Sequence, residues 1–184
     1  MEQLKNEKLT VTISAHGAEL QSIKNAEGRE YLWQGDEKYW PRRSPLLFPI
    51  VCGLWKDEYR VDGRTFNLPR HGFARDMDFE VVEKSDTSVT YTLESSPETR
   101  EVYPYDFELD VTYILNDDAI SVIWSVKNTG KQEMHFQIGG HPAFNLPGVA
   151  EGDKIHGSIL FDNVEPLTRI IGNTGGCIKP ERYE

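Results

Sequence analysis

The sequence predicts an all-β protein, an antiparallel β-sandwich, and three observations support this. Apolar and polar residues alternate in several runs, and this period of two is typical of half-buried strands. Short turn signals such as Asp62-Gly63 separate neighbouring runs. No segment keeps a 3.6-residue apolar period, and the 10 prolines interrupt the chain too often for long helices.

The individual strands follow from the same alternation. The clearest is residues 107–115, where every second residue is apolar, and the alternation returns over 120–126 after the turn residues 116–118. These two runs are therefore expected to form a hairpin, and the Asp62-Gly63 turn predicts another. The strands expected in chain order cover residues 59–61, 65–68, 79–83, 88–93, 107–115, 120–126 and 134–138.

Length and composition restrict the class of protein. With 184 residues, 38% of them hydrophobic, the chain can bury one sizeable core, and a single domain over residues 1–184 is expected. The net charge of −10 argues against nucleic acid or an anionic membrane as partner, because phosphate groups would be repelled. Residues 1–10 lack an apolar run, so we expect neither a signal peptide nor a membrane anchor. We therefore expect a cytoplasmic location. Cys52 and Cys177 lack metal-like or redox-like spacing and are expected to be reduced thiols.

Two histidines stand in short, stiff segments. His141 follows two glycines, which let a ligand approach the backbone, and precedes Pro142, which restricts the backbone beyond it. An imidazole held in this way suits proton transfer near neutral pH, although it could also be a loop residue bonded to a carbonyl. His71 precedes Gly72, and a turn there could point its ring into a pocket or serve a structural role.

Arginines and aromatic residues accompany these histidines. Arg75 follows His71 by four residues, and its planar fork suits paired contacts with hydroxyls or a phosphate; an ion pair with Asp76 or Asp78 is the alternative. Sugar sites commonly set an aromatic face beside a forked donor. The proline-bounded segment 39–53 offers both, with Trp40, Arg42, Arg43 and Phe48.

A metal site is the weaker interpretation of the histidines. His71, His135 and His141 could approach one another, but the chain has no HxH or HExxH pairing and no carboxylate at a ligand-like offset. The glycines near residues 172–176 do not fit a phosphate-binding loop. Neither a metal nor an organic cofactor is therefore expected.

The two histidine segments, 71–76 and 139–145, resemble those of a known family. Read with Tyr31-Leu32-Trp33 and with residues 44–49, they resemble the aldose 1-epimerase (galactose mutarotase) superfamily, closest to its LacX-like branch. The resemblance implies a galactose mutarotase-like supersandwich. It also implies that residues 1–184 form the N-terminal portion of the family domain, an incomplete sandwich that ends before the later strands. A homodimer remains open.

The resemblance implies a carbohydrate isomerase that interconverts the α and β anomers of an aldose or aldose phosphate by ring opening. His141 would be the general acid that protonates the ring oxygen, and His71 would bind the sugar and help polarise that oxygen. The expected substrate contacts are Arg75, Arg43 and Asn145.

Two departures from the family pattern bear on this expectation. The family's general base is a glutamate followed by proline and tryptophan, which nothing in this chain matches, so the chain alone is expected to have little activity. Leu54 stands where the galactose-specific branch has an arginine, which argues against free galactose. The alternative function is a non-catalytic carbohydrate-binding β-sandwich.

Overall fold

The structure is a computed structural model that describes residues 1–146, 148–149, 152–154, 160, 169–172 and 178–183. Its strands are β1 (Glu2–Lys5), β2 (Leu9–Ile13), β3 (Leu20–Asn25), β4 (Leu46–Leu47), β5 (Glu58–Val61), β6 (Arg64–Asn67), β7 (Glu80–Lys84), β8 (Ser88–Glu94), β9 (Phe107–Asn116), β10 (Ala119–Asn128), β11 (Gly139–Gly140), β12 (Arg169–Gly172) and β13 (Ile178–Tyr183). Short 3-10 turns cover Trp55–Asp57 and Ala74–Asp76.

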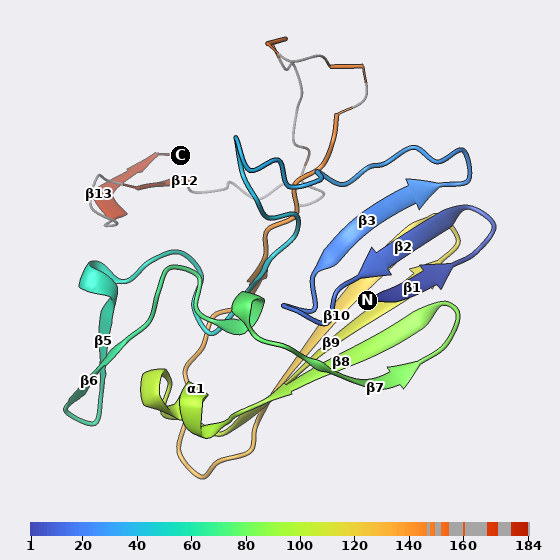
Figure 1. Ribbon diagram of the computed structural model, residues 1–184. Coiled ribbons are helices and arrows are strands. Elements are labelled where there is room, and N and C mark those ends of the chain that lie inside the picture. The colour runs from blue at the N-terminus through green and yellow to red at the C-terminus, as the bar shows by residue number, and fades with distance from the viewer. Residues whose placement is uncertain (147, 150–151, 155–159, 161–168, 173–177, 184) are drawn as a thin grey trace.

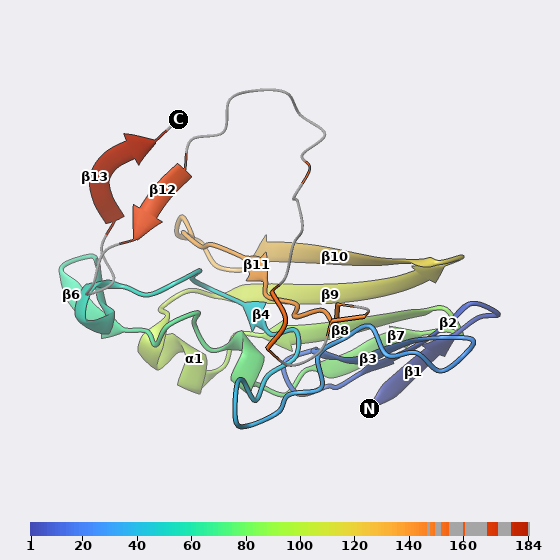
Figure 2. The same ribbon diagram turned by 90° about the horizontal axis from the view of Figure 1, so that it is seen from above.

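Two antiparallel sheets pack face to face and confirm the predicted β-sandwich. One has the order β1-β2-β3 and the other β10-β9-β8-β7. Figures 1 and 2 show the smaller sheet lying across the larger one. The β5-β6 hairpin projects away from this sandwich, on the side where the helix α1 (Pro97–Val102) lies (Figure 1).

The core lies between the two sheets. The inward-facing side chains of β9 alternate with partly exposed ones, as the sequence predicted, and each is at most 4% exposed: Phe107, Leu109, Val111, Tyr113 and Leu115. The Tyr113 hydroxyl donates to the carbonyl of Ala18 at 2.6 Å, so it ties the larger sheet to the turn before β3. Burying such side chains supplies most of the stabilisation, roughly 1.5–3 kcal/mol for each large apolar group.

Both predicted hairpins are present. In β5-β6, Val61 pairs with Arg64 across Asp62 and Gly63, whose φ angles of 48° and 76° are those of a turn that matches the strand twist. In β9-β10, Asn116 pairs with Ala119. The strands expected over 79–83 and 88–93 correspond to β7 and β8, so the local alternation located these elements well.

The strand expected over residues 134–138 is wrong, because the regular pairing there is limited to β11, Gly139–Gly140. Its partner β4 is bounded by Pro45 and Pro49, which have no N–H group to extend the ladder. Single contacts hold the preceding segment instead. The Gln137 N–H donates to the Pro49 carbonyl at 2.9 Å, and the Gln137 side-chain oxygen accepts from the Val51 N–H at 3.0 Å.

The prediction of no long helix is confirmed in the described part of the chain. The helix α1 covers Pro97–Val102 and begins at Ser96, whose hydroxyl accepts from the Thr99 N–H at 3.2 Å while the Thr99 hydroxyl accepts from the Ser96 N–H at 2.8 Å. Among the residues the structure describes, no helix has the length and apolar character needed to cross a membrane.

Candidate functional site

Three segments that are distant in sequence meet beside the sandwich and bring the two histidines together. Strand β4 pairs antiparallel with β11, and Phe48 forms a parallel bridge with Gly72. The His141 N–H donates to the Pro45 carbonyl at 3.1 Å, and the His71 N–H donates to the Cys52 carbonyl at 2.8 Å. Both histidine segments are therefore held by backbone contacts with the segment 44–52.

Gly72 is required by the closeness of this packing. A Cβ atom on Gly72 would lie 2.2 Å from the carbonyl oxygen of Phe48, and its φ of +69° is in the left-handed region. His71 itself has a φ of 70°, so two consecutive residues share this conformation. The sequence showed a turn here, and the structure shows that the turn folds tightly under the Phe48 backbone.

The imidazole rings of His71 and His141 lie close together. Their ring centroids are 6.0 Å apart with an interplanar angle of 70°, and the ring of Trp40 lies 5.0 Å from that of His141. His141 is exposed, whereas His71 is partly buried. The two rings and the indole therefore line a site that is open to solvent on the His141 side.

The hydrogen bonds of His71 fix its protonation state. Its Nδ1 accepts from the Cys52 N–H at 3.0 Å, so Nδ1 carries no proton and the neutral ring carries its proton on Nε2. Burial lowers the pKa of His71, and the charges of Arg75, His141, Arg70 and Arg42 lower it further. His71 is therefore a neutral hydrogen-bond donor near physiological pH.

Arg75 and Arg42 share one carboxylate next to this pair. The Arg42 Nη2 donates to Asp76 Oδ1 at 2.8 Å, and the Arg75 Nε lies 3.5 Å from Asp76 Oδ2. The Arg75 Nη2 also donates to the carbonyl of Arg70 at 2.8 Å, but its buried Nε has no hydrogen-bond partner. Burial, and then the neighbouring Arg42, lower the pKa of Arg75. The ion pair expected as an alternative for Arg75 is thus present with Asp76.

Arg43 lies in a different setting from Arg75. Its guanidinium carbon is 3.4 Å from the position that a Cβ on Gly35 would occupy, and its buried Nε has no hydrogen-bond partner. Its own N–H and that of Ser44 donate to one carboxylate oxygen of Glu19, at 3.0 and 2.8 Å. The structure thus packs Arg43 against the 35–41 turn.

Asn145 holds the chain that follows His141. Its side-chain amide donates to the Leu32 carbonyl at 2.8 Å, and its N–H donates to the Tyr31 carbonyl at 2.8 Å. Phe144 forms a bridge with Leu32 in the same place. The structure therefore ties Asn145 to the segment 30–32, and its role as a sugar contact stays a prediction.

His135 does not join the two histidines in any described contact. Its carbonyl accepts from the Tyr103 hydroxyl at 2.9 Å, and its side chain is exposed. Within the described ranges, no group of three or more histidine, cysteine or carboxylate side chains is placed to hold a metal ion. Cys52 is a free thiol, and Cys177 lies outside the described residues.

Some residues of the site could not be found from the sequence. Arg70 contributes its carbonyl to Arg75 and its charge to the surroundings of His71. Asp76 was expected only as an alternative partner of Arg75, and its pairing with Arg42 was not foreseen. Glu19 holds the backbone of the arginine segment. A carboxylate that accepts from a distant backbone has no sequence signature. The charge at Arg70 was the available signal, since it precedes His71 directly.

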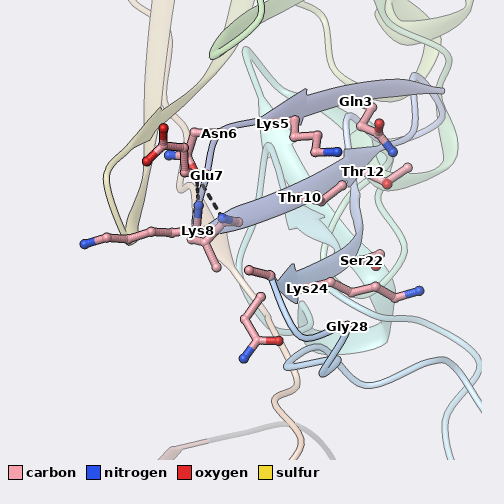
Figure 3. A pocket seen from close by; sticks show the side chains of 13 residues that line it. Gln3, Lys5, Asn6, Glu7, Lys8, Thr10, Thr12, Ser22, Lys24 and Gly28 are labelled. Carbon is pink, nitrogen blue, oxygen red and sulfur yellow. Dashed lines mark hydrogen bonds between the residues drawn. The ribbon is translucent and has the colours of Figure 1, made fainter.

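A surface cavity of about 540 Å³ lies on the outer face of the β1-β2-β3 sheet. Figure 3 shows its polar lining, which includes Lys5, Thr10, Thr12, Ser22 and Lys24. The side chain of Asn6 there accepts from the N–H groups of Lys8 and Leu9 and closes the β1-β2 turn. This cavity has neither a histidine nor an aromatic ring in its lining, so it lacks the chemistry of the histidine site.

Comparisons with known proteins agree with this architecture. The family model described as aldose 1-epimerase matches residues 2–161. The chain is 42% identical to the chromosomal LacX protein of Lactococcus lactis subsp. lactis, over 89% of this chain and 56% of LacX, and the plasmid-encoded LacX gives the same values. It therefore spans little more than half the length of the curated relatives it matches.

Solved structures give the same result. The galactose mutarotase related enzyme from Lactobacillus acidophilus is 37% identical with a TM-score of 0.85, covering 99% of this chain and 61% of that one. A galactose mutarotase-like protein from Lactobacillus casei ATCC 334 is 43% identical with a TM-score of 0.77, covering 79% of this chain and 50% of that one.

Proposed function

The chain belongs to the aldose 1-epimerase family, and on this premise we propose that its site binds the ring form of an aldose or aldose phosphate and serves the interconversion of its α and β anomers. The observation that carries the proposal is the pairing of His71 and His141, 6.0 Å apart beside Trp40. An indole face suits the apolar face of a sugar ring, and two imidazoles suit its polar edge.

His141 is the general acid of this proposal. Opening a hemiacetal ring requires a proton on the ring oxygen while a base removes the proton of the anomeric hydroxyl. His141 is exposed on the open side of the site, so it can take up a proton from solvent and pass it to a bound sugar. Its backbone N–H donates to the Pro45 carbonyl, a bond that does not involve the ring nitrogens.

His71 complements His141 by donating a hydrogen bond from Nε2. Because its Nδ1 is occupied by the Cys52 N–H, the Nε2–H is the group left for a ligand. A neutral donor polarises a ring oxygen without competing for the proton that His141 delivers. The two histidines therefore take different roles because their surroundings differ.

The arginines favour a substrate that carries a phosphate. Arg42 and Arg75 share Asp76, so this part of the site keeps a positive charge in a chain whose net charge is −10. The planar guanidinium of Arg75 suits paired contacts with phosphate or hydroxyl oxygens. We assign Arg75 as the nearer substrate contact, with Arg43 and Asn145 as further contacts.

We assign no general base among the residues that the structure describes. Asp76 is the carboxylate that contacts both Arg42 and Arg75, so each of its two oxygens already faces a guanidinium group. The chain therefore binds sugar but interconverts anomers slowly by itself. Binding without turnover is also what a non-catalytic carbohydrate-binding protein would show, so that function is the second candidate.

The test combines binding with anomer exchange. Ligand-detected NMR with glucose, galactose and their 6-phosphates is expected to show binding that His71→Ala and His141→Ala weaken. His135→Ala, which removes an exposed imidazole elsewhere, is the matched control and should bind as the original chain does. Exchange spectroscopy between the anomers in the same samples is expected to give rates close to those in buffer.

Two results would contradict parts of the proposal. Absence of binding by all four sugars would overturn the function itself. Exchange rates well above those in buffer, lost in His141→Ala but not in His135→Ala, would show that the chain holds its own base.

A further inference from the structure

The loop of residues 49–52 is held by hydrogen bonds from two sides. On one side, the Val51 N–H donates to the Gln137 Oε1 at 3.0 Å. On the other side, the Cys52 N–H donates to the His71 Nδ1 at 3.0 Å, and the His71 N–H donates to the Cys52 carbonyl at 2.8 Å. The side chains of Gln137 and His71 therefore hold two successive N–H groups of this loop.

The loop depends on these bonds because its backbone is strained. Cys52 has a φ of 68°, in the left-handed region that residues other than glycine rarely adopt. Such a conformation persists only where the surrounding contacts impose it. Cys52 is exposed, and its neighbours Ile50 and Leu54 line a cavity of about 370 Å³. Hydrogen bonds rather than close packing therefore set the path of the loop at this point.

The direction of the Cys52 N–H decides which tautomer His71 adopts. A neutral imidazole can carry its proton on either ring nitrogen. As long as the Cys52 N–H points at Nδ1, that nitrogen is the acceptor and Nε2 is the donor. A rotation of the peptide between Val51 and Cys52 would take this donor away and would allow the other tautomer. Whatever fixes this peptide thus fixes the group that His71 presents to a ligand.

We propose that Gln137 is a positioning residue for His71. Its side-chain oxygen holds the Val51 N–H and so fixes the peptide that follows, which keeps the Cys52 N–H on the His71 Nδ1 and the proton on Nε2. Gln137 lies in the segment that leads into His141, so the segment of one histidine controls the ring of the other. The effect on the tautomer needs no ligand, whereas its importance for sugar binding rests on the proposed function.

The backbone of Gln137 is anchored well enough for this role. Its N–H donates to the Pro49 carbonyl at 2.9 Å. Two residues later, Gly139 pairs with Leu47, and a Cβ on Gly139 would lie 3.3 Å from a methyl group of Val51. Because the backbone is already fixed, the side-chain oxygen can hold the Val51 N–H with little further loss of conformational entropy.

The test measures the tautomer of His71 directly in the 184-residue chain. With ¹⁵N labelling, the chemical shifts of the ring nitrogens distinguish a protonated Nδ1 from an unprotonated one, and His71→Asn identifies the signals of this ring. Spectra are recorded at about pH 8, where the ring is neutral because the ordinary histidine pKa is about 6.5 and burial lowers that of His71. An unprotonated Nδ1 is expected in the original chain.

Two substitutions of Gln137 isolate its acceptor oxygen. Gln137→Met keeps the length of the side chain without the oxygen, and it should raise the share of the Nδ1–H tautomer roughly fivefold, which corresponds to one ordinary hydrogen bond. Gln137→Glu keeps an acceptor oxygen and should restore the original tautomer. Gln132→Met makes the same exchange at an exposed glutamine whose side chain donates to the Pro104 carbonyl, and it should leave His71 unchanged.

Amide hydrogen exchange shows how far the change extends. In Gln137→Met the Val51 amide loses its acceptor, and the Cys52 amide should exchange roughly fivefold faster as well, because its bond to the imidazole is weakened. The His141 amide, which bonds to the Pro45 carbonyl, should keep its rate. A merely structural role of Gln137 would instead loosen the His141 amide and leave the imidazole tautomer unchanged.

The outcomes for the tautomer and for sugar binding are separable. An unchanged tautomer in Gln137→Met would overturn the positioning role, and so would equal changes in Gln137→Met and Gln137→Glu. Exchange at the His141 amide that rises as much as at Cys52 would overturn it too, because the whole segment would then have moved. Ligand-detected NMR measures binding of glucose and its 6-phosphate in the same samples. A changed tautomer with unchanged sugar binding would leave the positioning role standing and count against the role proposed for His71.

Discussion

Strands β9 and β10 are neighbours with the same apolar alternation, yet they differ in what covers them. Val111 of β9 is 1% exposed, whereas its partner Trp124 of β10 is 38% exposed on the same face of the sheet. Tyr113 is 4% exposed and its partner Val122 is 39% exposed. The alternation thus predicts which side chains face inward. Whether an inward-facing side chain is also buried depends on the packing of an element that is distant in sequence.

The same difference separates the two histidines of the site. His71 is partly buried and its Nδ1 is bonded to the Cys52 backbone, whereas His141 is exposed and its ring contacts Trp40. Both histidines lie in short segments of similar sequence that contain glycine. Two residues with similar local sequence, one buried and one exposed, therefore form a suitable pair for testing the structure.

The largest effect is expected from a pair of glycines with left-handed backbones. Gly72→Ala and Gly63→Ala start from φ angles of +69° and +76°, but a Cβ on Gly72 would meet the Phe48 carbonyl at 2.2 Å and one on Gly63 would meet nothing within 4 Å. Both pay the left-handed strain of about 1–2 kcal/mol. Gly72→Ala also overpacks a backbone contact, so its total loss should exceed about 3 kcal/mol.

Chemical denaturation followed by circular dichroism measures both glycine variants. Equal losses would mean that the Phe48–Gly72 contact relaxes without cost, and the tight assembly of the site would then be wrong. A failure of Gly72→Ala to fold agrees with the prediction, provided that Gly63→Ala folds.

A smaller effect is expected from the same truncation on the two strands of the hairpin. Val111→Ala removes two methyl groups from a side chain that is 1% exposed and should cost about 2 kcal/mol, including the cavity it leaves. Val122→Ala removes the same groups from a side chain that is 39% exposed and should cost less than about 1 kcal/mol. Urea denaturation with a shared slope gives both values. A cost at Val122 equal to that at Val111 would show that β10 is covered in solution.

The fold was largely predictable because its signals are local. Alternation and the Asp62-Gly63 turn lie within a few residues of the strands they specify, and both hairpins were found from them. The strand predicted over 134–138 is wrong, because Pro45 and Pro49, on a partner segment far away in sequence, limit the regular pairing to Gly139–Gly140. A strand needs a partner, and one sequence segment does not show which partner it has.

The site was predictable in its histidines but not in its geometry. The resemblance indicated His71 and His141. The structure places their rings together, because both segments contact residues 44–52, as in the bridge between Phe48 and Gly72. The link between Arg42 and Asp76, and the bond from Cys52 to His71, depend on folds of the chain that leave no local pattern. These contacts set the protonation of His71 and the charge around it, which are the properties that matter for chemistry.

The smallest expected effect is on the pH dependence of the free energy of unfolding, and it tests His71, the partly buried histidine of the site. Burial, followed by the charge of Arg75, lowers the pKa of His71 below its ordinary value of 6.5. The unfolded chain therefore binds this proton at a higher pH than the folded chain, so the free energy of unfolding falls as pH drops below about 6.5 and levels off below the lowered pKa. His71→Asn keeps an acceptor for the Cys52 N–H and tolerates a left-handed backbone, but it cannot titrate.

His71→Asn should therefore have a flatter dependence of unfolding free energy on pH between 7 and 5 than the original chain. His135→Asn removes an exposed histidine elsewhere in the chain and is the matched control. Urea denaturation at several pH values compares the three proteins through their slopes, so a constant loss of stability in either variant does not matter. If His71→Asn kept the full slope, the contact of His71 with Cys52 and its partial burial would not control its charge, and the two histidines of the site would be alike.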